Sequence, residues 1–265
     1  MRGGRFALFA SLLCASFDAR VAGADVITHI PTNDKVVALT FDACEAGDPM
    51  SFDRGILDYL LARKLPFTLF VTGKFVESNT ADVEALAALD FVEIENHSWS
   101  HPNWMDHYEP EAVVRQVERG HEAIVSATGR SPQFFRFPAG NYNADGLKAV
   151  ERLGYKVVHW RWASGDPDPR ETADALFHRV TSNVAAGDIL IFHINGRGYH
   201  TAEALPRIVE RLEADGYRFV LISDYIGRPR PRGSPPPSAT TVSLWKRFDD
   251  WLARFPFGAL PRALN

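Results

Sequence analysis

The chain has 265 residues, of which 46% are apolar, and a formal net charge of −4 at pH 7. This length suits one large α/β domain with short extensions or two small domains, and the apolar content is enough for a sizeable core. Charges of both signs are spread along the chain without a basic block, which argues against a nucleic-acid partner.

Residues 1–24 have the order of a secretory signal peptide. Arg2 and Arg5 precede an apolar run at residues 6–17, and the small residues 22–24 follow where a signal peptidase would cleave. We therefore predict cleavage before Asp25 and a periplasmic or secreted mature protein. The apolar run is too short for a permanent membrane anchor. Cys14 would suggest a lipoprotein, but a leucine precedes it where a small residue is expected, so we favour cleavage.

Removal of this segment leaves Cys44 as the only cysteine, which excludes an intramolecular disulfide. We expect the thiol to be buried as a small apolar group, or else to lie near a metal.

Strand-like and helix-like segments alternate between residues 36 and 222. The strand-like runs lie at residues 36–41, 67–71, 92–95, 134–137, 156–160, 188–192 and 218–221. Apolar residues share one helical face in three intervening stretches: Ile56, Leu57, Leu60 and Leu61; Val113, Val117, Ile124 and Val125; and Leu205, Ile208, Val209 and Leu212, with Pro206 expected in the first turn. The alternation predicts an α/β fold with a parallel sheet, either closed into a barrel of fewer than eight strands or open and doubly wound.

The main domain is predicted to end at residue 227. Residues 228–241 are rich in Pro, Arg and Ser and are typical of an extended linker. Residues 242–265 predict an amphipathic C-terminal helix. Because its polar faces carry both signs of charge, docking on the domain or on a partner is favoured over binding in a membrane interface.

Residues whose side chains could take part in catalysis or metal binding follow several predicted strands, at the edge where parallel α/β folds form their active sites. His97 and His101 follow the third strand, four residues apart, and would point the same way on one helical turn. Two imidazoles so placed suit a metal ion, although isolated histidine pairs more often lie at a surface or cap a helix. Asp42 ends the first strand and is a candidate ligand or general base, because Ser51 or Asp48 is expected to cap the next helix.

Two further strand ends carry candidate catalytic groups. His193 ends the sixth strand and is a candidate general acid, since the pKa of histidine lies near working pH. Arg136 follows the fourth strand and could hold Asp42 or Asp166 in a bidentate pair. The plainer interpretation of His193 is a buried histidine that is hydrogen-bonded to the backbone, and that of Arg136 is a structural ion pair.

Five segments, taken in order, resemble the motifs of the polysaccharide deacetylase family (carbohydrate esterase family 4) over roughly residues 34–226. They are Thr40-Phe41-Asp42, His97-Ser98-Trp99-Ser100-His101, Arg136-Phe137-Pro138-Ala139-Gly140, Asp166 and Leu190-Ile191-Phe192-His193. The resemblance implies a distorted (β/α) barrel of about seven parallel strands and a divalent metal, typically Zn²⁺, as cofactor. It also implies that His97, His101 and Asp42 bind that metal and that Asp42 is the general base.

The same resemblance implies the remaining roles. Asp166 would orient Arg136, His193 would protonate the leaving amine, and a backbone N–H near Ala43 would help to stabilise the oxyanion. The substrate would be a polysaccharide or acetylated oligosaccharide.

Two positions depart from the family pattern. Ala43 stands where the family usually has a second aspartate, the third metal ligand, so Asp42 itself, Glu45, Asp48 or water must serve instead, or metal binding is weak. Ala139 replaces a tyrosine of the groove wall. The glycine-rich stretch at residues 195–200 is expected either to rim the site or to be a plain surface loop. In the first case Arg197 and His200 could contact the substrate, or His200 could replace the missing metal ligand.

The favoured hypothesis is therefore a metal-dependent hydrolase that removes N-acetyl or other acyl groups from a polysaccharide or cell-wall glycan. The alternative is a catalytically weakened protein of the same fold that binds carbohydrate, which Ala43 motivates. A third hypothesis keeps the enzyme but makes the substrate a small amide or a formylated lipid-linked sugar. Four tryptophans suggest stacking on sugar rings, although tryptophans are more often core residues: Trp99, Trp104, Trp160 and Trp162.

Overall fold

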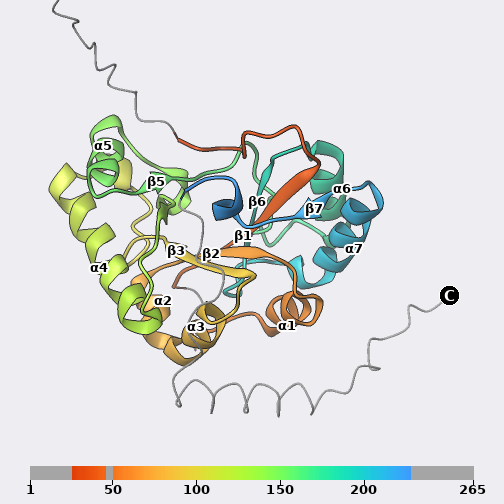
Figure 1. Cartoon of the computed structure of the whole chain (residues 1–265), viewed down its shortest axis with the longest axis horizontal. Coiled ribbons are helices and arrows are strands. Elements are labelled where there is room, and N and C mark those ends of the chain that lie inside the picture. The colour runs from red at the N-terminus through yellow and green to blue at the C-terminus, as the bar shows by residue number, and fades with distance from the viewer. Residues whose placement is uncertain (1–25, 46–49, 228–265) are drawn as a thin grey trace, which may run out of the picture.

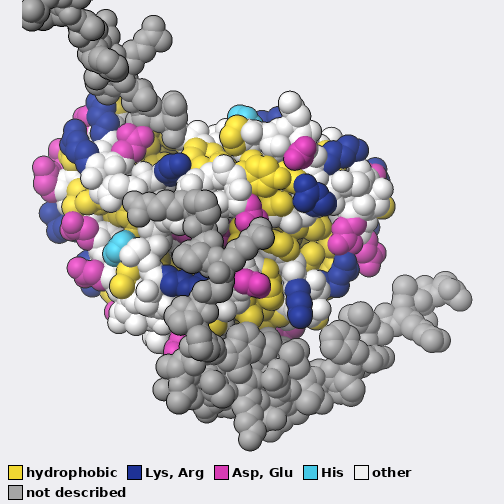
Figure 2. Space-filling model, viewed as in Figure 1, with side chains coloured by type: hydrophobic (Ala, Val, Ile, Leu, Met, Phe, Trp, Pro, Cys, Tyr) yellow, Lys and Arg dark blue, Asp and Glu magenta, His cyan; other side chains and the backbone are white. Residues whose placement is uncertain are grey.

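The computed structural model describes residues 26–45 and 50–227, which form one α/β domain (Figure 1). The predicted signal peptide, linker and C-terminal helix lie outside these residues. Within them, no helix has the length and apolar character needed to cross a membrane. Charged side chains of both signs are scattered over the face seen in Figure 2.

Seven parallel strands form the sheet that the sequence predicts. The strands are β1 (Val36–Ala43), β2 (Phe67–Val71), β3 (Val92–Asn96), β4 (Phe134–Phe135), β5 (Lys156–Val157), β6 (Ile189–His193) and β7 (Arg218–Phe219). Their order is β5-β4-β3-β2-β1-β6, and β7 pairs with the beginning of β1. The sheet curls into a distorted, incompletely closed barrel, as the family resemblance implies (Figure 1). β4, β5 and β7 are shorter than predicted.

Seven α-helices cover the outer side of this sheet (Figure 1). They are α1 (Arg54–Arg63), α2 (Gly73–Ser78), α3 (Thr80–Ala87), α4 (Pro110–Thr128), α5 (Ala144–Arg152), α6 (Ala173–Asn183) and α7 (Thr201–Ala214), with short 3-10 turns at Met105–His107, Pro138–Gly140 and Ile222–Asp224. The predicted apolar faces of α1, α4 and α7 are buried, except that Val125 is only half-buried.

Two local predictions about helices are wrong. The side chain of Asp53 caps α1 by accepting a hydrogen bond from the backbone N–H of Ile56 at 3.3 Å, so Ser51 is not the cap. Asp48 lies outside the described residues. Pro206 lies in the second turn of α7, because the helix begins at Thr201, earlier than the apolar pattern suggests.

Side chains of β1 point alternately to the two sides of the sheet, and the two sides pack in different apolar clusters. Leu39, Phe41 and Ala43 belong to the large apolar cluster that also contains buried residues of α1 and α7. Val36 and Ala38 point to the other side, into the barrel, and pack in a second cluster. Because side chains alternate along a strand, Asp42 also faces the barrel interior.

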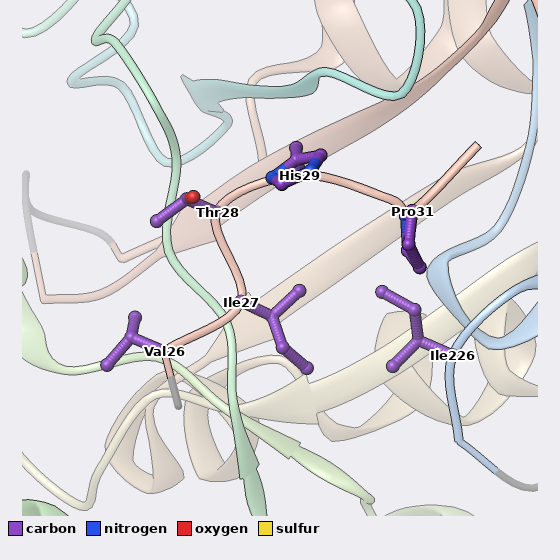
Figure 3. A pocket seen from close by; sticks show the side chains of 6 residues that line it. All are labelled: Val26, Ile27, Thr28, His29, Pro31 and Ile226. Atoms are coloured by element: carbon purple, nitrogen blue, oxygen red, sulfur yellow. The ribbon is translucent and has the colours of Figure 1, made fainter. Parts of the chain in front are cut away.

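The segment at residues 26–31 runs between β5 and β6, the two ends of the strand order. Ile27 makes a parallel bridge to Val158 and His29 an antiparallel bridge to Asp188. A pocket of about 310 Å³ lies between this segment and Ile226 (Figure 3). None of the predicted site residues lines it.

A buried carboxylate, Glu93, fastens the C-terminal part of the domain to β3. Its Oε2 accepts hydrogen bonds from the hydroxyl of Thr68 at 2.7 Å and from the N–H of Ile222 at 3.2 Å. Its Oε1 accepts from the N–H of Ser223 at 3.1 Å. Glu93 is fully buried, so these donors have no access to water as substitute partners.

We predict that Glu93→Leu lowers the free energy of unfolding by about 3 kcal/mol or more, because it leaves several buried donors unpaired. Urea unfolding followed by circular dichroism measures the change. Glu118→Leu, at an exposed position of α4, is the matched control. A loss no larger than that of the control would show that Glu93 does not hold this region together.

Candidate active site

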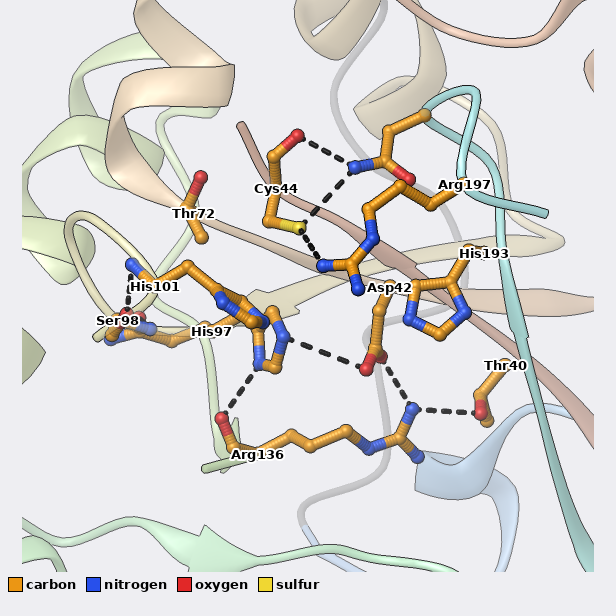
Figure 4. A network of polar contacts seen from close by, with 12 residues as sticks. Thr40, Asp42, Cys44, Thr72, His97, Ser98, His101, Arg136, His193 and Arg197 are labelled. Carbon is orange, nitrogen blue, oxygen red and sulfur yellow. Dashed lines mark hydrogen bonds and ion pairs between the residues drawn. The ribbon is translucent and has the colours of Figure 1, made fainter. Parts of the chain in front are cut away.

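Four predicted site residues meet at the carboxyl ends of the strands (Figure 4). Asp42 lies near the end of β1, and His193 ends β6. The register of these neighbouring strands pairs Asp42 directly with His193, so the two side chains leave the sheet on the same face. His97 directly follows β3, and Arg136 directly follows β4.

Asp42 and Arg136 form a buried ion pair. Arg136 Nη1 donates to Asp42 Oδ1 at 2.7 Å and lies 2.9 Å from Thr40 Oγ1. The guanidinium stacks on the ring of Phe70 at 3.9 Å, and its Nε donates to the carbonyl of Val158 at 3.3 Å. The pair uses one nitrogen and one oxygen, so the bidentate geometry that we expected is absent.

This pairing keeps Asp42 ionised. Burial alone would raise the pKa of the Asp42 carboxyl, but Arg136, His97 and His193 outweigh it and lower the pKa to about 2. Asp42 is therefore a carboxylate at any working pH, with one oxygen held by Arg136.

The two histidines lie together, as predicted, but not on a helical turn. The ring centroids of His97 and His101 are 4.9 Å apart. The segment between them is a loop in which Ser98 and His101 have φ values of 75° and 47°. Asn96 Oδ1 accepts from the N–H of Ser98 at 3.0 Å, and Ser98 Oγ accepts from the N–H of His101 at 3.1 Å. These bonds hold the loop that brings both rings to one place.

The tautomer of His97 follows from its backbone partner. His97 Nδ1 lies 2.8 Å from the carbonyl oxygen of Arg136, which can only accept, so Nδ1 carries the proton. The Nε2 atom then presents a lone pair 3.5 Å from Asp42 Oδ2 and has no hydrogen-bond partner although it is buried. An unpartnered buried lone pair beside a carboxylate is a suitable place for a cation.

The donor set fits a divalent metal in part. Burial lowers the pKa of His97, and burial together with His97 lowers the pKa of His101 to about 3, so both imidazoles are neutral as metal ligands must be. Two imidazoles and a carboxylate are groups that zinc binds. Within residues 26–45 and 50–227, however, no three His, Cys, Asp or Glu side chains stand as a ready metal cluster.

The residues considered as a third metal ligand have different surroundings. Ala43 is fully buried and offers no side-chain donor. Glu45 Oε2 accepts from Thr72 Oγ1 at 3.1 Å, and its Oε1 lies 3.7 Å from Lys74 Nζ. His200 is exposed and its Nδ1 lies 3.8 Å from Glu203. Asp48 falls outside the described residues.

Asp166 is placed differently from what the resemblance implies. It does not contact Arg136; its Oδ1 lies 2.9 Å from His193 Nδ1, and its Oδ2 accepts from the N–H of His193 at 2.7 Å. The hydroxyl of Thr201 also donates to Oδ2, at 3.0 Å. The expectation that Asp166 orients the arginine is therefore wrong: Asp166 orients the histidine.

The Asp166 carboxylate sets both the orientation and the basicity of His193. Burial by itself lowers the pKa of His193, but the hydrogen bond and charge of Asp166, aided by Asp42, raise it above the usual value. Since Nδ1 donates to Asp166, Nε2 is the atom left to exchange a proton with a substrate.

Cys44 is buried, as the sequence predicts, and burial raises the pKa of its thiol to about 11. Asn195 Nδ2 donates to the carbonyl of Cys44 at 2.7 Å. Sequence reasoning missed the supporting roles of Thr40, Thr201 and Asn195. Only Thr40 carried a signal, because it lies two residues before Asp42 and therefore on the same face of the strand.

The four tryptophans divide between the surface and the interior. Trp104 is 64% exposed and stacks on His107. The other three are partly covered: Trp99 lies 3.9 Å below Arg119, Trp160 lies 5.5 Å from Arg136, and Trp162 donates to Asp188 at 3.1 Å. Of these four side chains, that of Trp104 is the most exposed.

Comparisons with known proteins place the chain among polysaccharide deacetylases. A family model described as polysaccharide deacetylase matches residues 29–158. The peptidoglycan-N-acetylglucosamine deacetylase of Bacillus cereus is 30% identical over 206 residues, covering 76% of this chain and 92% of that protein.

Two solved structures have a fold similar to that of this chain. A family 4 acetyl xylan esterase from Clostridium thermocellum, in complex with a cobalt ion, has a TM-score of 0.64 and 28% identity, covering 72% of this chain and 90% of that one. A mutant of a CE4 family pseudoenzyme from Bacillus anthracis, with restored enzymatic activity, has a TM-score of 0.68 and 25% identity, covering 76% of this chain and 71% of that one. On these similarities, together with the strand-end site, the chain belongs to the polysaccharide deacetylase family, carbohydrate esterase family 4.

Proposed function

We propose that this protein is a metal-dependent hydrolase that removes N-acetyl groups from a cell-wall glycan in the periplasm or outside the cell. One observation carries the proposal. Asp42 and His193 face each other across neighbouring strands, and each has its own charged partner, Arg136 and Asp166. A carboxylate kept ionised and an imidazole whose pKa is raised can act as the base and the acid that amide hydrolysis needs.

The proposed role of each residue follows from the side-chain atom that its charged partner does not hold. Asp42 Oδ2, which Arg136 does not hold, accepts the proton of the attacking water. His193 Nε2 donates a proton to the amine nitrogen as the bond to the acyl carbon breaks. When bound beside His97 and His101, a divalent metal such as Zn²⁺ supplies Lewis acidity for the water and the acyl oxygen.

The proposal that the substrate is a cell-wall glycan has two supports of its own. The Bacillus cereus relative is named for peptidoglycan N-acetylglucosamine. The predicted signal peptide supports export to the compartment where such glycans lie. Release of acetate from N-acetylated peptidoglycan and chitooligosaccharides, with and without a chelator, is the direct test.

A second candidate function is carbohydrate binding with weakened or lost catalysis. Ala43 supports it, because the position offers no ligand, and the structural similarity to a pseudoenzyme shows that this fold exists without activity. Purified protein that holds no metal and releases no acetate, yet binds the same glycans, would favour this alternative over hydrolysis.

Removal of either histidine is expected to abolish turnover without unfolding the protein. We predict that His193→Ala lowers kcat at least about a hundredfold, because general acids contribute roughly that much or more. His97→Ala should be as severe, since it removes a metal ligand. Acetate release and a thermal unfolding curve are measured for each variant. His178→Ala, exposed on α6, is the control, and turnover in either site variant at the control level would refute the roles.

The pH profile is expected to fall on its alkaline side. Asp42, with a pKa of about 2, stays ionised, whereas His193 must hold a proton and loses it as the pH rises through its raised pKa. Asp166→Asn removes the charge that raises this pKa, so the alkaline limb of kcat/KM should move to lower pH. Asp168→Asn removes an exposed carboxylate paired with Arg170 and should leave the limb in place. An unmoved limb in Asp166→Asn would contradict His193 as the acid.

Restoring a carboxylate at position 43 is expected to tighten metal binding. The carbonyl of Ala43 accepts from the N–H of Thr72 at 3.0 Å, and the next N–H, of Gly73, donates to the carbonyl of Ser98 at 3.0 Å. Position 43 therefore lies beside the loop that carries His97 and His101. We predict at least tenfold tighter Zn²⁺ binding by Ala43→Asp in calorimetry, with Ala43→Asn as the uncharged control. Equal affinities would mean that other residues already complete the site.

A further inference from the structure

The loop at residues 194–200, which follows β6, is fixed against the active site. A Cβ added to Gly198 would lie 2.2 Å from the carbonyl oxygen of His193 and 3.1 Å from Asp166 Oδ2, so only glycine fits there. The N–H of Tyr199 donates to the carbonyl of Asp166 at 2.9 Å. On the other side of the loop, Asn195 is held to Cys44. This part of the chain is therefore not a loose surface loop.

This loop presents a guanidinium to the site. Arg197 is half-buried, and its Nη1 lies 3.9 Å from Cys44 Sγ, a weak acceptor. In the view of Figure 4 the Arg197 side chain lies between the pair of His97 and His101 on one side and His193 on the other, with its guanidinium directed toward Cys44 Sγ. Its charge lowers the pKa of His101 and opposes the raised pKa of His193, which agrees with a position between them.

The carboxylates described around the site already have partners. Asp42 pairs with Arg136, Asp166 with His193, and Glu45 with Lys74. Among residues 26–45 and 50–227, no carboxylate forms an ion pair with Arg197. A second polar group on the loop is also unsatisfied, because Asn195 Oδ1 is buried without a hydrogen-bond partner. Within the described residues, the loop thus presents near the site histidines a cation that has no carboxylate partner.

We propose that Arg197 binds a carboxylate on the substrate, so that the preferred substrate is an N-acetylated sugar bearing an acidic group close to its acetamido group. The guanidinium offers several donors in a planar fork that matches a carboxylate, and partial burial strengthens the interaction. The flanking backbone fixes the loop before binding, so little ordering is needed. This inference rests on the proposed function and narrows its substrate class.

The kinetic test compares two substrates that share the acetamido group and differ in charge. They are a chitooligosaccharide, which is neutral, and peptide-free peptidoglycan strands, whose N-acetylmuramic acid residues carry a lactyl carboxylate. We expect Arg197→Gln to lower the ratio of kcat/KM for the acidic over the neutral substrate by tenfold or more, mainly through KM. Arg197→Lys should recover part of the loss. Arg211→Gln, which removes an equal charge at the far end of α7, should not change the ratio.

An unchanged ratio in Arg197→Gln would overturn the proposal. Equal loss on both substrates would overturn it as well, because Arg197 would then serve the acetyl group that both contain.

A binding measurement separates this inference from the proposed function. If the protein hydrolyses neither substrate, the proposed function fails, and calorimetry with N-acetylmuramic acid and N-acetylglucosamine still tests Arg197. Tighter binding of the acidic sugar that disappears in Arg197→Gln would support the carboxylate site. Equal binding of both sugars by the unaltered protein would refute it.

Discussion

The buried ion pair between Asp42 and Arg136 is the interaction on which the site depends. Burying two charges is costly unless their remaining hydrogen-bonding groups are satisfied, and here Thr40 and the carbonyl of Val158 contribute to that. The same arginine also fixes His97, whose Nδ1 meets its backbone carbonyl at 2.8 Å. One residue, Arg136, thus holds Asp42 with its side chain and His97 with its main chain, so the spacing of the proposed base and the proposed metal ligand depends on where β4 ends.

Two aspartates in one site take different roles because their partners differ. Asp42 faces a guanidinium that cannot give up its proton, so the pair keeps its charge and the carboxylate remains a base. Asp166 faces an imidazole that can exchange one, so its charge is used to raise the pKa of His193. The different roles proposed for Asp42 and Asp166 therefore depend on the chemistry of their neighbours and not on exposure, since both carboxylates are buried.

The sequence predicted the sheet and the strand-end residues because both follow from short-range patterns. Parallel strands place their carboxyl ends at one edge, which brings together Asp42, His97, Arg136 and His193 without knowledge of the strand order. The partner of Asp166 was mispredicted because that residue lies in an irregular segment, whose position depends on distant contacts with Thr201 and with the N–H of Tyr199. The two histidines lie together as predicted, but the loop that brings them together was not predicted. Nothing in the sequence indicates that Ser98 and His101 have positive φ values.

The single free oxygen of Asp42 constrains how a metal can take part. Arg136 holds Oδ1, so Oδ2 is the atom left either to ligate a cation beside His97 or to accept a proton from water. A carboxylate oxygen bound to a cation is a poorer base, because a nearby positive charge favours its ionised form. In the proposed mechanism Asp42 would therefore serve best as the base if another group completed the coordination of the metal. The missing carboxylate at Ala43 consequently bears on catalysis as much as on metal affinity, since without a substitute ligand the metal and the water compete for one atom.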